Sequence, residues 1–147
     1  MIHRLSQVID RPVQEVFATV VDAGNYASWN PTIKSSRGLT PGEARDGSEF
    51  EWELRGFGKV RQRLEEFDRD HRVRLVPRMR SLGGGHRFTF ADLGGKTRVD
   101  HELEMIPKGL FKFMGPLITR TGRANLLTTA EALKRHLEEG RRSDFAG

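Results

Sequence analysis

Cysteine is absent from the 147-residue chain, so a disulfide framework, a thiolate metal site and a cysteine nucleophile are all excluded. Long apolar runs are also absent: none approaches the roughly 20 residues that span a bilayer, and no apolar signal segment stands at the N-terminus. We therefore expect a cytoplasmic protein. A chain of about 150 residues buries roughly 68–70% of its unfolded surface, which is enough for a sizeable core without covalent cross-links.

Charge of one sign does not dominate. The chain has 25 basic and 20 acidic residues and a formal net charge of +5, which in principle favours an anionic partner such as nucleic acid or a membrane surface. The strand pairing described next, however, places six arginines on a solvated sheet face beside glutamates, with no aromatic residues between them. A solvated surface is therefore the preferred interpretation, and we expect no binding of nucleic acid.

The most informative stretch runs from Gly47 to Ile106, where glycine-rich turns separate alternating runs. The pair Gly94-Gly95 can supply the two positive φ angles that a tight hairpin loop demands. If this pair forms the loop, Phe88 lies opposite His101 on a nearly apolar face. The other face carries opposite charges, which favours this register.

The same test applies to Gly56-Phe57-Gly58. Folding about Phe57 places Trp52 opposite Gln62 on one face and Glu53 opposite Arg61 on the other. The next run, Arg72 to Arg80, also alternates between apolar and basic residues. Alternation over so many strands predicts an antiparallel sheet with one solvated and one covered face.

The triplet Gly83-Gly84-Gly85 resembles a phosphate-binding loop only superficially. It lacks a following helix and the lysine and serine of a P-loop, so we interpret it as a flexible hairpin connection.

The segments before and after this stretch give the chain an α+β order of elements, in which one long helix covers the sheet. We expect a first strand at Ile2–Ile9, a helix that Asp10 can cap and that ends near Asp22, a helical turn at Asn25–Pro31, a second strand at Ile33–Leu39, and a helix from Leu117 to Glu139 that stops at Gly140. Residues 1–140 form a single predicted domain, and 141–147 form a predicted frayed tail.

Several motifs in series resemble the SRPBCC superfamily, which includes START lipid-transfer domains, the birch pollen allergen family and polyketide cyclases. They are Asp10-Arg11-Pro12 with Val16-Phe17, Tyr26-Ala27-Ser28-Trp29-Asn30-Pro31, Gly47 with Phe50 and Trp52, Gly94 to Arg98, and Leu133-Lys134 with Leu137-Glu138. The resemblance covers essentially the whole chain and suggests a single-domain member of bacterial type. It implies a helix-grip fold: a seven-stranded curved antiparallel sheet wrapped around a long C-terminal helix, with two short helices between strands 1 and 2 and a pocket for a small hydrophobic ligand. It does not imply one chemistry, because fold does not fix function.

Given that fold, the inner face of the sheet is expected to line a cavity of roughly 300–1,000 Å³, unless its side chains fill the space completely. Trp29 is expected chiefly as a core anchor, and the apolar stripe of the helix does not settle which way Thr121 and Asn125 turn. The predicted ligand-binding residues are Trp29, Phe50, Trp52, Leu54, Gln62, Leu64, Leu75, Met79, His86, Phe88, Phe90, His101, Leu103, Met105, Thr121 and Asn125.

The candidate acid/base residues are His101 and His86, which the predicted register brings near one another on the covered face. The alternative is that each is a buried histidine hydrogen-bonded to backbone or water. Two histidines without a third ligand make a poor zinc site, so we expect no metal and no cofactor.

Three functions remain open. The first is a binding or carrier protein for a lipid, polyketide or aromatic compound; the second is a polyketide cyclase or dehydratase that uses His101 or His86, with Gln62 orienting the substrate; the third is an interaction module that uses the arginine-rich face. The apolar segment Leu110–Met114 is either a lip at the pocket mouth that touches membranes transiently or a segment packed under the helix. We expect no stable membrane insertion, and either a monomer or a homodimer.

Overall fold

The computed structural model describes residues 2–146, except the side chains of residues 111, 114–119 and 141–146. The described strands form one antiparallel sheet in the order β1-β7-β6-β5-β4-β3-β2. The elements are β1 (Ile2–Ile9), α1 (Val13–Val21), the 3-10 helix η1 (Ala23–Ser28), β2 (Ile33–Gly38), β3 (Glu49–Leu54), β4 (Gly58–Asp68), β5 (Arg72–Pro77), β6 (Leu82–Asp92), β7 (Thr97–Pro107), the 3-10 helix η2 (Gly109–Met114) and α2 (Gly115–Ala146).

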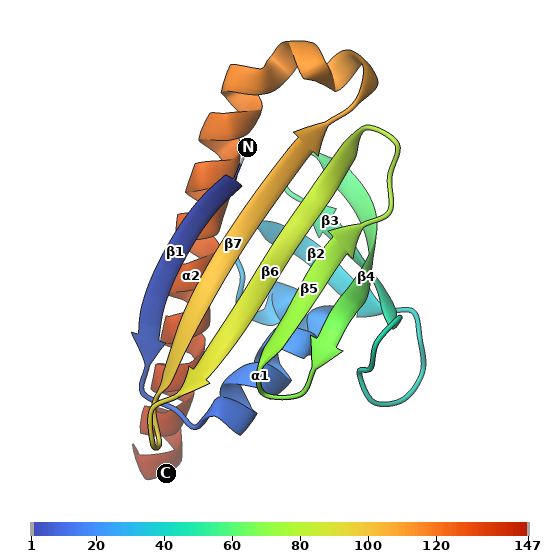
Figure 1. Cartoon of the computed structure of the whole chain (residues 1–147). Coiled ribbons are helices and arrows are strands. Elements are labelled where there is room, and N and C mark those ends of the chain that lie inside the picture. The colour runs from blue at the N-terminus through green and yellow to red at the C-terminus, as the bar shows by residue number, and fades with distance from the viewer. Residues whose placement is uncertain (1, 147) are drawn as a thin grey trace.

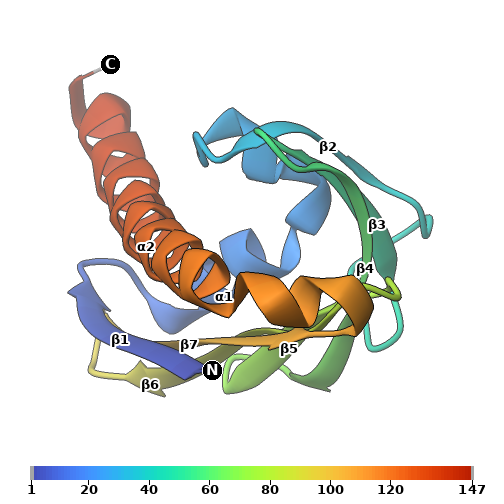
Figure 2. The same ribbon diagram turned by 90° about the horizontal axis from the view of Figure 1, so that it is seen from above.

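The sheet curves around the helices, so the predicted helix-grip fold is confirmed. Figure 1 shows α2 running behind β1 and β7, and Figure 2 shows the sheet bending from β1 round to β2 on the far side. Helices α1 and η1 close one end of the concave face. No described helix combines the length and apolar character needed to cross a membrane.

The predicted register of β6 and β7 is confirmed. The Leu93 amide donates a hydrogen bond of 2.8 Å to the Lys96 carbonyl across the Gly94-Gly95 loop. Phe88 pairs with His101, as expected from that loop. Both glycines have positive φ, 78° and 90°, which explains why this dipeptide sets the turn.

The predicted register of β3 and β4 is wrong by two residues. Trp52 pairs with Val60 rather than with Gln62, because the loop is Arg55 to Phe57 and centres on Gly56. Gly56 has a φ of 77°, and the Phe57 amide closes the turn on the Leu54 carbonyl at 3.2 Å. A shift by two keeps each side chain on its predicted face, since strand side chains alternate with period two.

The predictions for the next strands need two corrections. β5 ends at Pro77 rather than at Arg80, so Met79 lies in the following loop. Gly83 to Gly85 belong to β6 and pair with Glu104 to Ile106 of β7, so they are not a flexible connection. Positive φ at Gly84 and Gly85, 95° and 128°, lets this strand pass very close to its neighbours, where a side chain would not fit.

Two helix boundaries also differ from expectation. The N-cap residue of α1 is Pro12, which makes no side-chain capping bond, so the cap lies two residues after its expected position, Asp10. α2 begins at Gly115 and continues past Gly140 to Ala146, while residue 147 of the expected tail lies outside the described residues. Gly140 therefore lies inside the helix, where glycine costs about 1 kcal/mol relative to alanine.

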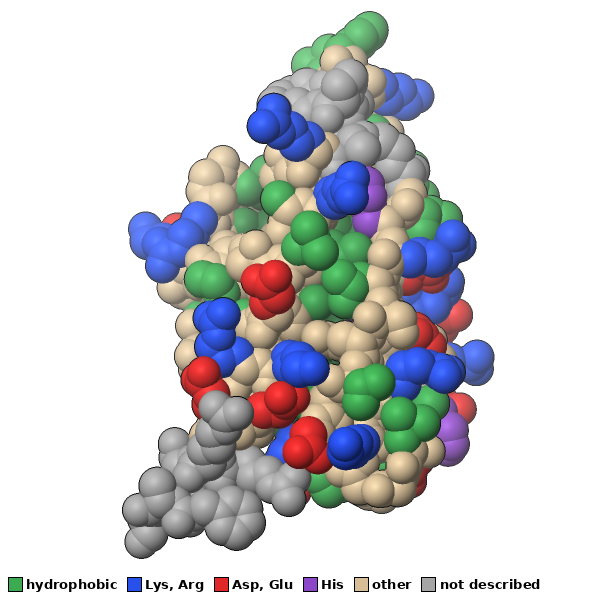
Figure 3. Space-filling view, turned by 90° about the vertical axis from the view of Figure 1, so that its left-hand side faces the viewer, with side chains coloured by type: hydrophobic (Ala, Val, Ile, Leu, Met, Phe, Trp, Pro, Cys, Tyr) green, Lys and Arg blue, Asp and Glu red, His purple; other side chains and the backbone are tan. Residues whose placement is uncertain are grey.

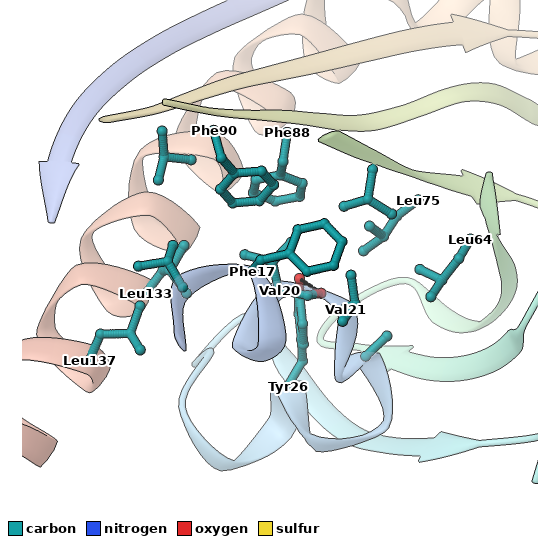
Figure 4. Packing of buried hydrophobic residues seen from close by; sticks show 14 of the residues in the cluster. Phe17, Val20, Val21, Tyr26, Leu64, Leu75, Phe88, Phe90, Leu133 and Leu137 are labelled. Carbon is teal, nitrogen blue, oxygen red and sulfur yellow. Dashed lines mark hydrogen bonds between the residues drawn. The ribbon is translucent and has the colours of Figure 1, made fainter. Parts of the chain in front are cut away.

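The core lies at the end of the concave face that α1 closes. Phe17 packs edge-to-face on Phe67 and Phe90, with ring centroids 5.3 and 5.4 Å apart. Figure 4 shows Val20 of α1 and Leu133 of α2 in the same cluster. Here side chains of the predicted inner face pack into a buried core cluster.

Tyr26 and Trp52 anchor η1 to the sheet. The Tyr26 hydroxyl donates to the Val20 carbonyl at 2.6 Å, and the Trp52 indole nitrogen donates to the Ala23 carbonyl at 2.8 Å. The two rings stack 4.7 Å apart, and Trp29 packs on Tyr26 at 4.5 Å. Trp29 is therefore a partly buried core anchor, as the sequence suggested.

Replacing Gly84 by alanine should lower the free energy of unfolding by about 2–4 kcal/mol, because positive φ is strained for alanine and its Cβ would overlap the Glu104 carbonyl. Urea denaturation measures this change. Gly38→Ala is the matched control: its Cβ position has no atom within 4 Å, so stability should change by no more than about 0.5 kcal/mol. Equal effects of the two substitutions would contradict the assignment of close strand approach.

Candidate ligand cavity

A cavity of about 410 Å³ lies between α2 and the concave face of the sheet, at the end away from the α1 core. Its lining comes from η1 and the following loop, from β3 to β7, and from the first turns of α2. The lining residues are Tyr26, Asn30, Thr32, Trp52, Leu54, Arg55, Phe57, Val60, Gln62, Pro77, Leu82, Gly83, Gly85, His86, Phe88, Leu103, Glu104, Met105, Thr121, Gly122, Ala124, Asn125, Thr128 and Thr129.

Several small residues on β6 and α2 contribute to the cavity lining. Gly83 and Gly85 on the strand and Gly122 and Ala124 on the helix contribute little side-chain volume to the space between them. A Cβ at Gly122 would overlap the sulfur of Met105, so this glycine lets the helix approach the sheet closely.

Two histidines form a hydrogen-bonded pair at the boundary between cavity and core. The Nδ1 atom of His86 and the Nε2 atom of His101 are 2.8 Å apart, so one of them carries the shared proton. His86 lines the cavity and keeps some accessible surface there. His101 lies behind it, 2% exposed and stacked on Phe88 at 4.1 Å.

Both imidazoles are neutral at pH 7. Burial lowers the pKa of His86 to about 4. Burial, and to a lesser extent the neighbouring His86, lowers the pKa of His101 well below 6.5. In a neutral pair, His86 can donate from Nε2 toward the cavity when its Nδ1 accepts from His101, and it can accept there when its Nδ1 donates to His101.

A second polar group lies where η1 meets α2. Asn30, which is 2% exposed, donates to the Thr129 hydroxyl at 3.1 Å and accepts from Thr32 at 2.8 Å. Gln62 is also buried, at 4% exposure, and lines the cavity from β4. Burial, with a smaller effect of Asp22, raises the pKa of Tyr26 well above its usual value, so its phenol stays neutral. The cavity is thus apolar with a few uncharged polar groups inside.

Comparison with known proteins agrees with this architecture. A sequence model of the family described as polyketide cyclase / dehydrase and lipid transport matches residues 3–138. The chain belongs to this family. No protein with a curated function matches it.

Several solved structures are similar to this chain over nearly its whole length. A START superfamily protein from Mycobacterium smegmatis has a TM-score of 0.77 at 17% identity and covers 94% of this chain and 97% of its own. A protein from Thermus thermophilus has a TM-score of 0.78 at 17% identity, with 95% and 99% covered. The Zhui aromatase/cyclase from a Streptomyces species has a TM-score of 0.61 at 12% identity, with 92% and 94% covered.

The structure divides the predicted site residues of this family member into two groups. The first group lines the cavity and consists of Trp52, Leu54, Gln62, His86, Phe88, Leu103, Met105, Thr121 and Asn125. The second group lies outside the cavity lining: Trp29, Phe50, Leu64, Leu75 and Phe90 pack in or against the core, His101 supports His86, and Met79 is in a loop. The roles of both groups in ligand binding remain predictions.

Other lining residues were not singled out from the sequence. Val60 and Pro77 share the inward parity of their strands and were detectable by that signal alone. Tyr26 and Asn30 lie within the motif that carried the family resemblance. The lining glycines carried no such signal, because only the crossing of α2 over the sheet makes their small size significant.

The histidine pair predicts acid sensitivity. Because the folded-state pKa values are lowered, the unfolded chain binds more protons below pH 6.5, and stability should fall as the pH drops from about 6.5 toward 4. The loss attributable to His86 is roughly 3 kcal/mol. Denaturation across this pH range should give a flatter profile for His86→Gln than for the unmodified protein. His71→Gln, at an exposed position, should leave the slope unchanged, and equal slopes in all three proteins would contradict a buried neutral pair.

Proposed function

We propose that the protein binds a small, mostly hydrophobic molecule in the cavity between α2 and the sheet. The main support is an apolar cavity of about 410 Å³, which lies in the range of roughly 300–1,000 Å³ typical of small-molecule sites. The family, whose description includes lipid transport, and the START-type fold agree with a hydrophobic ligand. The hydrophobic effect would favour binding, because the apolar cavity walls and the apolar ligand are both removed from water.

The polar groups inside the cavity define what the ligand should carry. Gln62 and His86 are uncharged groups that can donate or accept a hydrogen bond, and burying them without a partner is costly. A carbonyl or hydroxyl oxygen on the ligand can form a hydrogen bond with either group. No described cation lies in the buried part of the cavity beside His86, so a carboxylate buried there would lack a counter-charge. The proposed ligand is therefore an uncharged ketone, phenol or alcohol with an apolar body.

Filling the cavity should abolish binding without unfolding the protein. Ala124 lies on an exposed part of α2 yet lines the cavity, so Ala124→Trp places an indole in the proposed site. We expect the affinity for an uncharged dye such as N-phenylnaphthylamine, followed by fluorescence, to fall at least about tenfold because the dye and the indole compete for one volume.

The matched control is Arg135→Trp, which adds the same side chain to an exposed part of the same helix. It should leave dye binding unchanged. Circular dichroism confirms that both variants keep their helix content. Equal dye affinity in the two variants would contradict binding in this cavity, and failure of the unmodified protein to bind any apolar dye would contradict the proposal as a whole.

The histidine pair favours a second candidate, a cyclase or dehydratase of polyketide-like substrates. In this scheme His86 removes a proton from a methylene group between two carbonyls, the resulting enolate attacks a distant carbonyl of the same chain, and the imidazolium returns the proton to the new alkoxide. The attack itself closes the ring, and loss of water then introduces a double bond into it. The observation that supports this scheme is the 2.8 Å contact with His101, which would orient a neutral His86 toward the cavity.

Replacing His86 or His101 by glutamine should abolish cyclisation while leaving the fold intact, since glutamine fills a similar volume but cannot take up a proton. The assay is the absorbance of the aromatic product formed from a poly-β-ketothioester analogue. His71→Gln should retain full activity. Activity that survives in both His86→Gln and His101→Gln would remove this candidate and leave ligand binding as the proposed function.

A further inference from the structure

Two large apolar side chains project into solvent beside the cavity. Leu110 and Phe113 on η2 are 83% and 86% exposed. Phe57, which lines the cavity from the β3–β4 turn, is 46% exposed, and Ile106 at the end of β7 is 43% exposed. Figure 1 shows that η2 and the β3–β4 turn lie at the same end of the molecule, at its top. We call this surface the cavity end.

The cavity end is connected directly to the cavity lining. Gly83, a lining residue, pairs with Ile106, and the Lys108 amide, one residue before η2, donates to the Ser81 carbonyl at 2.9 Å. Lining residues with exposed side chains, such as Phe57 and Thr121, mark where the cavity reaches the surface. Figure 2 views the molecule from this end, with η2 and the start of α2 crossing in front of the sheet.

Basic residues surround the apolar tips, and acidic residues are almost absent. Residues 54–64, 71–91 and 105–130, which supply the loops of this end, contain no aspartate or glutamate. The basic residues of the cavity end are exposed: Arg55, Lys59, Arg78, Arg80, Lys108, Lys112, Arg120 and Arg123. In the space-filling view of Figure 3, green and blue side chains meet at the top while most red ones lie lower down.

The charge on the outer face of the sheet is arranged differently. Arg37 pairs with Glu51 at 3.2 Å, and Arg87 contacts both Glu66 and Glu102 at 3.2 and 3.3 Å. Among the ion pairs within the described part of the chain, none involves the eight basic residues of the cavity end. The outer face thus holds part of its positive charge in ion pairs, whereas the eight basic residues of the cavity end present theirs to solvent.

We propose that the cavity end docks on an anionic lipid membrane. Leu110 and Phe113 enter the headgroup region, and the eight basic residues meet lipid phosphates around them. Protruding apolar side chains suit a soft lipid layer better than a nucleic acid, whose backbone offers charge but no apolar interior. The proposal goes beyond ligand binding, because it gives the apolar ligand a route between bilayer and cavity that does not cross water.

Flotation with vesicles tests this inference on the intact chain. The protein should bind vesicles of equimolar phosphatidylcholine and phosphatidylglycerol and should bind phosphatidylcholine alone much more weakly. Leu110→Ser with Phe113→Ser should weaken binding at least about tenfold because the apolar contribution is lost. Lys112→Gln with Arg123→Gln should weaken binding about fivefold for each charge removed, and high salt should weaken the binding of the unmodified protein.

Matched controls sit at the opposite end of the molecule. Leu93→Ser removes a leucine that is 49% exposed, and Lys96→Gln removes an exposed charge from the same hairpin. Both should bind vesicles normally. Equal binding by control and cavity-end variants, or binding indifferent to phosphatidylglycerol, would overturn the inference. Because the cavity-end substitutions lie outside the cavity lining, their retained affinity for N-phenylnaphthylamine separates a failure of docking from a failure of ligand binding.

Discussion

The ladder between β6 and β7 holds a single register from Leu82 opposite Pro107 to Asp92 opposite Thr97, and it thereby decides which side chains enter the interior. Its inner face carries Phe88 and His86 on one strand and His101 on the other. Strand alternation then propagates the same choice across the sheet through β5 and β4. The core, the histidine pair and the cavity wall are all consequences of this register.

The two ends of the concave face differ because the covering helices differ. Near α1, side chains from Phe17 and Val20 pack against those of the sheet in a buried cluster. Near the start of α2, small residues such as glycine and alanine belong to the lining of an open cavity. One inner face of nearly uniform apolar character therefore serves as a packed core at one end and as a cavity wall at the other.

Polar groups and charges follow the same division. Uncharged groups such as Gln62 and His86 face the cavity, where desolvation keeps the histidine neutral. Several arginines on the outer face, such as Arg37 and Arg87, are paired with glutamates, while those at the cavity end lack such partners within the described residues. The molecule thus combines an uncharged interior with a positively charged entrance. In our proposals, this arrangement admits an apolar ligand and places the entrance against an anionic surface.

The sequence by itself determined the fold class and the face of the sheet on which each side chain lies. Period-two alternation is a local property, and the Gly94-Gly95 loop fixes where it begins. The two-residue error in the β3–β4 register left this assignment intact for the same reason. Only the tertiary structure decided which inward residues line the cavity: Phe50 and Trp52 share a strand and a parity, yet only Trp52 reaches it. That outcome depends on how far α1 and α2 extend over the sheet. It also depends on small residues such as Gly122, whose role is set by the side chains on the facing strand.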